Sequence, residues 1–152
     1  MAPAEPIQTG NYEMNRILTA AALSLTTFAV PAIAADHMMS PMVEAMDQDV
    51  SNGVVSASKV MAPSNGWMVV HRTDAEMKPG PVVGYAPLRM GETDDVAVIL
   101  QEPVMSGDML MLMVHAEEGG MKTGVFEYTL GAKEDGPIKP DGKLVMSVIT
   151  AK

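Results

Sequence analysis

The sequence predicts an all-β fold, an antiparallel sandwich of about seven strands with immunoglobulin-like or cupredoxin-like architecture. Three observations support this prediction. Beyond residue 51, short β-prone runs alternate with turns rich in Gly, Pro, Asn and Asp. No segment there keeps a 3.6-residue hydrophobic period for long enough to form a major helix. Residues 52–152 suffice for one hydrophobic core and are too few for two domains.

An export signal precedes the predicted domain. An apolar run, ILTAAALSLTTFAVPAIA, follows a single arginine and ends in an A-x-A cleavage pattern at Ala32 and Ala34. We therefore assign residues 14–34 to a signal peptide that is cleaved after Ala34. Residues 1–13 are interpreted as an upstream extension or an expression remnant. The mature protein is expected in the periplasm or outside the cell, with no membrane span after cleavage; an uncleaved anchor helix is the alternative.

Residues 35–51 are expected to form a flexible, methionine-rich tail. After cleavage behind Ala34 the tail begins Ala35-Asp36-His37. A free α-amine, two backbone amides and an imidazole can then surround Cu(II) or Ni(II) in a square plane. Cleavage one residue later moves His37 to the second position and abolishes this site, and a histidine placed there by coincidence is the competing explanation.

Four methionines follow in the same tail, and their soft thioethers favour Cu(I) over harder ions. They are Met38, Met39, Met42 and Met46. The segment is similar to the extracellular amino-terminal segments of copper-uptake transporters, where His and Met cluster in the same way. Alternatively, these methionines form a promiscuous flexible surface that binds no metal.

The predicted strands follow one another with a turn after each. In chain order they are GVVSASKVM (53–61) before PSNG, WMVVHR (67–72) before DAEMKPG, PVVGYAP (81–87) before MGETDD, VAVILQEPV (96–104) before SGD, MLMLMVHA (109–116) before EEGG, TGVFEYTL (123–130) before GAKEDGP and PDG, and KLVMSVIT (143–150) at the end. Runs of this length between turn residues are typical of sandwich strands.

The two strands that contain histidine have an unusual pattern. The period-2 rule places Trp67, Val69 and His71 on one face of the first strand. On the second strand it separates two sets, Met109, Met111, Met113 and His115 on one face and Leu110, Leu112 and Val114 on the other. The aliphatic face suits a sandwich core. The methionine face is expected to point outward, toward a partner, or into a loosely packed second layer.

A metal site on that face would use His115 with Met113 and one cross-strand ligand, and His71 is a candidate for that ligand. Same-face neighbours on one strand lie ~7 Å apart, so a ligand from a second strand is needed. Copper is therefore the expected cofactor of both the tail and this face. Methionine as a core filler and histidine as a hydrogen-bonded structural residue are the alternative.

Four stretches of the chain form a pattern: GWMVVHR, LMLMVHA with the acidic residues after it, VFEY, and EDGPIKPDGKLVMSVIT. Together they resemble a secreted β-sandwich domain of unknown function that is found in halophilic archaea and in bacteria. The resemblance covers approximately residues 52–150 and implies export and a sandwich fold. It implies no catalytic residues, and the methionine load and the tail depart from the family's pattern.

The composition argues against several classes of function. The net charge is -9 and the ten basic residues are scattered, which disfavours nucleic-acid binding. The chain has no cysteine, which excludes disulfides, zinc–thiolate sites and Cys nucleophiles. It also lacks a nucleophile elbow, a P-loop and an H-E-x-x-H motif, so we do not expect an enzyme.

The leading expectation is thus an exported copper-binding protein that hands the ion on or sequesters it. One alternative is a structural or protein-interaction module of the cell envelope, with Met109, Met111 and Met113 as its contact surface. The other is a methionine oxidant sink.

Overall fold

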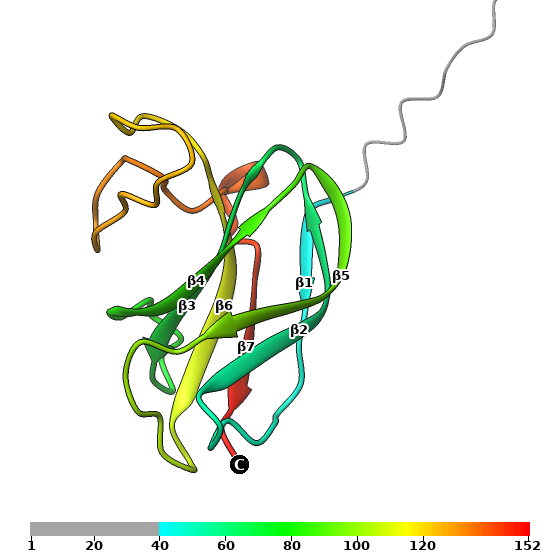
Figure 1. Cartoon of the computed structure of the whole chain (residues 1–152), viewed down its shortest axis with the longest axis vertical. Coiled ribbons are helices and arrows are strands. Elements are labelled where there is room, and N and C mark those ends of the chain that lie inside the picture. The colour runs from blue at the N-terminus through cyan, green and yellow to red at the C-terminus, as the bar shows by residue number, and fades with distance from the viewer. Residues whose placement is uncertain (1–39) are drawn as a thin grey trace, which may run out of the picture. The chain divides into compact units, whose positions relative to one another are not determined.

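The computed structural model describes residues 40–152, in which seven strands form two antiparallel sheets that face each other (Figure 1). The three-stranded sheet has the order β1 (Met42–Glu44), β2 (Val54–Ala62), β5 (Gly91–Ile99). The four-stranded sheet has the order β4 (Val82–Leu88), β3 (Gly66–Thr73), β6 (Met109–Ala116), β7 (Met146–Thr150). A short 3-10 turn, Pro140–Gly142, precedes β7. The predicted antiparallel sandwich is confirmed.

The hydrophobic core lies between the sheets and follows the period-2 alternation of the strands. Leu110, Leu112 and Val114 of β6 are at most 1% exposed and belong to this core, as the sequence predicts for the aliphatic face. Val55 and Ala57 of β2 face them from the other sheet and are fully buried. Each buried aliphatic side chain of this size contributes ~1.5–3 kcal/mol to folding.

The strand β1 lies in the segment for which the sequence predicts a flexible tail. Val43 pairs with Val60 of β2, is 9% exposed and belongs to the core. One apolar residue between Met42 and Glu44 is too short a pattern to indicate a strand. The folded domain therefore begins before the predicted boundary at residue 52, because this segment completes the three-stranded sheet.

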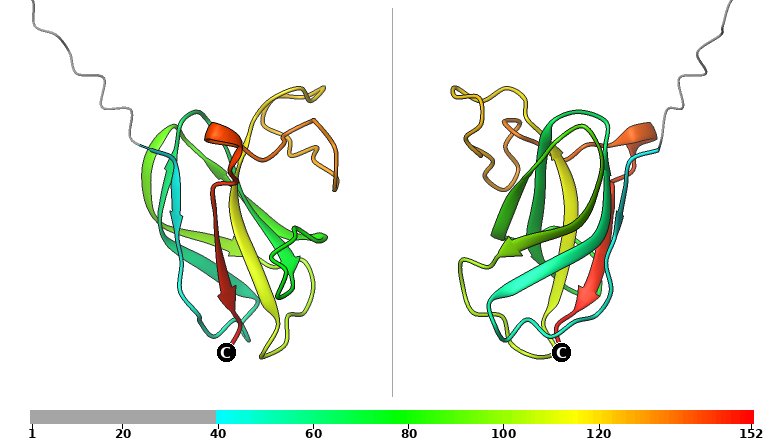
Figure 2. Two further views of the ribbon diagram at one scale, coloured as in Figure 1. Left: turned by 180° about the vertical axis from the view of Figure 1, so that it is seen from behind. Right: turned by 45° about the vertical axis from the view of Figure 1, so that its right-hand side comes forward.

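The connection between β6 and β7, residues 117–145, contains the largest difference from the prediction. The sequence predicts a strand at 123–130, whereas these residues form turns and irregular structure. Phe126 and Tyr128 instead pack against side chains of the four-stranded sheet. Aromatic residues favour half-buried surfaces, and this connection supplies one without strand pairing. Figure 2 shows the connection, yellow to orange, beside that sheet.

The connection helps to form a second layer on the outer face of the four-stranded sheet. We use "outer face" for six side chains that are at most 6% exposed yet lie outside the core between the sheets: Trp67, Val69, His71, Met111, Met113 and His115. The sequence predicts a second layer as one of three environments for the methionine face, and the structure selects it.

Within residues 40–152, no helix combines the length and the apolar character needed to cross a membrane.

Candidate metal centre

Two buried histidines meet on the outer face. Nε2 of His71 on β3 lies 3.3 Å from Nε2 of His115 on β6, and both residues are 0% exposed. Their ring centroids are 5.4 Å apart with an interplanar angle of 29°. In the β3–β6 ladder, the row of Val69 and Met113 separates the rows of the two histidines. The imidazoles therefore lean toward each other along the sheet and meet above that row.

Backbone carbonyls determine how both imidazoles are protonated. Nδ1 of His71 lies 2.8 Å from the carbonyl oxygen of Gly80, and Nδ1 of His115 lies 2.6 Å from that of Asp135. A carbonyl oxygen only accepts, so each Nδ1 carries the proton and donates it. Both Nε2 atoms are then unprotonated and face each other with their lone pairs. Moving a proton to either Nε2 would leave a Nδ1 lone pair facing a carbonyl oxygen.

The histidine pair is one hydrogen short near neutral pH. Three contacts in series need three hydrogens, whereas two neutral imidazoles supply two. Burial lowers the pKa of His71 below 6.5. Burial, with a smaller contribution from the charge of His71, lowers the pKa of His115 to about 4. A third proton is therefore disfavoured at pH 7, and another cation would satisfy both lone pairs.

An aromatic cluster lies beside the pair and contacts it through Phe126 and Tyr128. Its members are all the aromatic residues of the described part of the chain, Trp67, Tyr85, Phe126 and Tyr128. The ring of Tyr128 is perpendicular to that of His115 at a centroid distance of 4.6 Å, and lies 5.8 Å from that of His71. The ring centroids of Phe126 and Tyr85 are 4.4 Å apart. This layer helps to exclude water from the Nε2 atoms.

Asp135 ties the connection together over His115. It is 1% exposed and adopts φ of 45°, a left-handed conformation that Asp tolerates better than most residues. Its Oδ1 accepts the N–H of Glu118 at 3.1 Å, and its Oδ2 accepts that of Glu127 at 2.7 Å. Its own N–H donates to the carbonyl of Glu118 at 2.8 Å. The Asp135 carbonyl that orients His115 is thus held in place by three hydrogen bonds.

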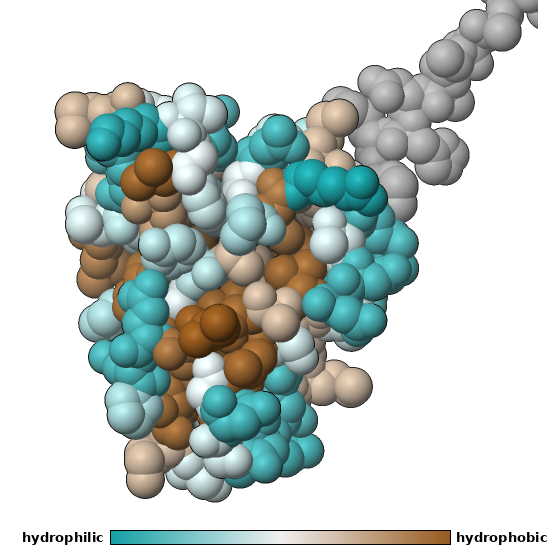
Figure 3. Space-filling view, viewed as in Figure 1, coloured by the Kyte–Doolittle hydropathy of each residue, from teal (hydrophilic) through white to brown (hydrophobic). Residues whose placement is uncertain are grey.

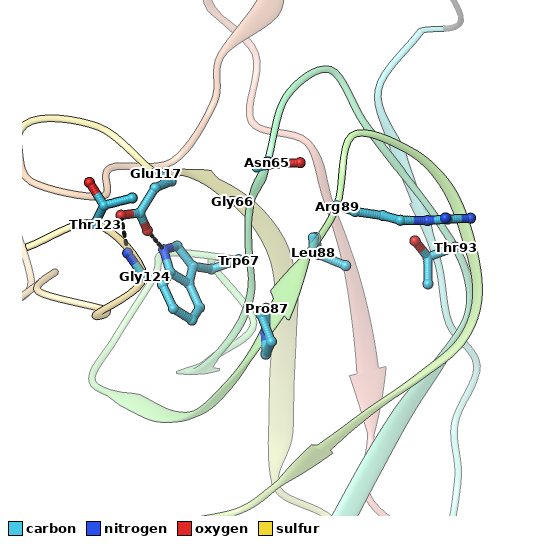
Figure 4. A pocket seen from close by; sticks show the side chains of 10 residues that line it. All are labelled: Asn65, Gly66, Trp67, Pro87, Leu88, Arg89, Thr93, Glu117, Thr123 and Gly124. Atoms are coloured by element: carbon cyan, nitrogen blue, oxygen red, sulfur yellow. Dashed lines mark hydrogen bonds between the residues drawn. The ribbon is translucent and has the colours of Figure 1, made fainter.

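A second anchor joins the connection to β3 beside an open cavity of about 650 Å³ (Figure 4). Nε1 of Trp67 donates to Oε2 of Glu117 at 2.7 Å, and the N–H of Gly124 donates to Oε1 at 2.7 Å. The cavity lining includes Trp67 and Leu88 but neither histidine. It is therefore separate from the histidine pair.

Two of the remaining predicted ligands lie within the described residues, and neither belongs to the outer face. Met42 is half-buried in the three-stranded sheet, and Met46 is 76% exposed. The other five lie outside the described residues: Ala35, Asp36, His37, Met38 and Met39. Of the predicted face ligands, the structure unites His71 with His115 and places Met113 in the row between them.

The contact surface predicted on the methionine face is closed. Met111 is 0% exposed and Met113 is 1% exposed, and Met109 at the start of β6 is half-buried. The chain itself covers these side chains, so they offer no open surface to a partner. Apolar side chains that do reach the surface gather near the middle of the face in Figure 3, over β5 and its neighbours.

Three residues of the site are absent from the sequence-based candidates. They are Phe126, Tyr128 and Asp135. Their positions depend on how the long connection folds back, which no short-range period reveals. The DGP turn that begins at Asp135 is the one local signal.

The histidine pair has few other metal-binding side chains beside it. Among residues 40–152, no group of three or more His, Asp and Glu side chains is placed to hold a metal ion. An ion at the histidine pair would therefore need a ligand of another type.

One family model matches the chain, that of a domain of unknown function named DUF7282, over residues 41–152. No curated protein and no solved structure matches the chain. The match includes β1, which the sequence-based domain boundary leaves out. The chain belongs to the DUF7282 family.

Proposed function

We propose that this protein is an exported copper-binding protein and that one ion binds between the Nε2 atoms of His71 and His115. The missing third hydrogen in the series from the Gly80 carbonyl to the Asp135 carbonyl carries this proposal. Imidazole nitrogen is a ligand for copper and other transition metals, whereas calcium and magnesium need several oxygen donors. The set of histidine neighbours provides no such oxygen cluster.

The separation of the two nitrogens suits a bent arrangement. At metal–nitrogen bonds of about 2.05 Å, nitrogens 3.3 Å apart subtend roughly 107° at the ion. A linear two-coordinate ion would need them about 4.1 Å apart at the same bond length. The observed spacing therefore favours an ion with at least one further ligand.

Export and an N-terminal copper site belong to the same proposal. Cleavage after Ala34 would free the amine of Ala35, which with His37 suits Cu(II), while the tail methionines suit Cu(I). Mass spectrometry of the exported chain should find Ala35 as its first residue. Adding one residue before Ala35 should abolish nickel-competable Cu(II) binding, and an unchanged affinity would exclude this N-terminal site.

The histidine pair is tested by titrating the ion-free protein with Cu(I) against a chromophoric chelator. We expect His71→Ala and His115→Ala each to weaken the internal site by more than about tenfold, since removal of a ligand should cost at least as much as removal of a supporting group. His37→Ala is the matched control and should leave that site intact. Binding no tighter than micromolar, or equal binding by all variants, would exclude the proposal.

Exposed methionines favour a second candidate function, an oxidant sink. Among residues 40–152, five methionines are at least 53% exposed: Met46, Met77, Met90, Met105 and Met121. Thioethers at the surface can be oxidised to sulfoxide and repaired. Peroxide followed by peptide mass spectrometry should modify these five first, with Met111 and Met113 protected and the fold retained. Unfolding at low oxidation would count against this function.

A further inference from the structure

We infer that the internal ion is monovalent copper and that Sδ of Met113 is its third ligand. This inference rests on the proposed function. The inference adds two points to that function: the oxidation state of the ion and a soft donor from the sheet beneath the histidines.

The strand register places Met113 below the meeting point of the imidazoles. His71 pairs with Met111 and His115 pairs with Trp67, so one row separates them. The two imidazoles extend toward each other across this row, and their Nε2 atoms are 3.3 Å apart. The gap between the Nε2 atoms therefore lies over the middle row. Met113 belongs to that row, is 1% exposed and lies on the same face as both histidines, so its thioether is the soft donor nearest to the gap by register.

The spacing of the nitrogens leaves room for such a donor. The angle of roughly 107° leaves one side of the ion open, and a three- or four-coordinate ion fills that side with another ligand. On the far side lies the ring of Tyr128, which is perpendicular to the imidazole of His115. The sheet side is therefore where the third ligand enters, and a thioether there selects Cu(I).

Charge also favours a monovalent ion. The solvation cost of burying an ion rises with the square of its charge, so a divalent ion in the same site costs about four times as much. Asp135 touches the site through its backbone carbonyl, and no Lys or Arg within residues 40–152 forms an ion pair at the site.

Cu(II) fits less well because the site lacks the ligands that this ion prefers. It favours square-planar or tetragonal sets of nitrogen and oxygen ligands. The pair supplies only two nitrogens, and no acidic cluster lies beside it to add the oxygen ligands that complete such a set. We expect Cu(II) and Zn(II) to bind this site more weakly than Cu(I) and Ag(I).

The test uses Ag(I) as a redox-silent probe of the full chain, with methionine methyl groups labelled with carbon-13 and histidines with nitrogen-15. Addition of Ag(I) should shift both Nε2 resonances and the Met113 methyl resonance together, with one common binding curve. Met113→Leu should weaken binding at the histidines by about tenfold or more. Ligands in the N-terminal tail do not obscure the result because each resonance reports its own site.

Met111→Leu is the matched control. Met111 is equally buried, on the same strand and the same face, but in the row of His71. We expect it to change the affinity less than about twofold, since leucine conserves its volume. If the Nε2 resonances shift while the Met113 methyl does not, the third-ligand inference is wrong and the proposed function stands. If neither Nε2 resonance shifts, the proposed function fails as well.

Discussion

Acid should destabilise the ion-free protein by about 3 kcal/mol between pH 6.5 and pH 4 because of His115. Burial lowers the pKa of this imidazole from 6.5 to about 4. Each pKa unit by which the folded and unfolded states differ changes the free energy of unfolding by about 1.36 kcal/mol. A difference of about 2.5 pKa units therefore gives about 3 kcal/mol. Burial lowers the pKa of His71 as well, which adds to the loss.

The sign follows from proton uptake. Below pH 6.5 the unfolded chain binds a proton at this histidine while the folded chain does not, so unfolding becomes more favourable as the pH falls. The contribution of neutral His115 is fully present above pH 6.5 and is lost by about pH 4. Asp108, whose pKa is lowered below 3.8 by the Met105 N–H and by Arg72, exerts its effect at lower pH.

The assay is urea unfolding with a chelator present, followed by the fluorescence of Trp67, the only tryptophan of the chain. His115→Gln cannot titrate in this range and should lose most of the pH dependence. His37→Ala controls for the loss of one imidazole and should keep it. Equal unfolding free energies at pH 6.5 and pH 4.5, or an unchanged slope in His115→Gln, would refute the assignment.

Four substitutions test the supports of the site. Gly66→Ala places a Cβ against the carbonyl oxygen of His115, so we expect a loss of more than about 2 kcal/mol in urea unfolding; a smaller loss would show that β6 can shift there. Trp67→Phe removes the donor to Glu117 and should cost about 1.5–3 kcal/mol by circular dichroism, and Glu117→Gln should cost less because it keeps an acceptor. Asp135→Asn weakens two backbone hydrogen bonds and should cost about 1.5–3 kcal/mol, with faster hydrogen exchange of the two donating amides; unchanged exchange would argue against its anchoring role.

The sheet strands could be predicted because their signals are local. In β6 the alternation of Met and Leu indicates which residues share a face. The face that contains Leu110 belongs to the hydrophobic core in the structure. Turn residues bound most of the runs. Val43 of β1 gains its place only from pairing with Val60, a contact across 17 residues that no local pattern indicates.

The candidate site could be predicted only as a set of residue types. His71, Met113 and His115 follow from the period-2 rule as members of one face. Their meeting depends on the register between β3 and β6 and on the lean of two side chains across an intervening row. The run containing Phe126 has the composition of a strand, yet it forms part of the layer over the histidines. Its aromatic side chains are partly buried there, as they would be in a sheet.

By itself the sequence determined a sandwich, its aliphatic core face and a Met/His face of unusual composition, since strand periodicity is a property of neighbouring residues. Only the tertiary structure decided that this face is internal and that its histidines form a pair. The protonation of that pair is decided by the carbonyls of Gly80 and Asp135, which come from segments 9 and 20 residues away along the chain. Hydrogen-bond partners are distributed by the folded chain, so the shortage of one hydrogen at the Nε2 atoms arises only when these segments meet.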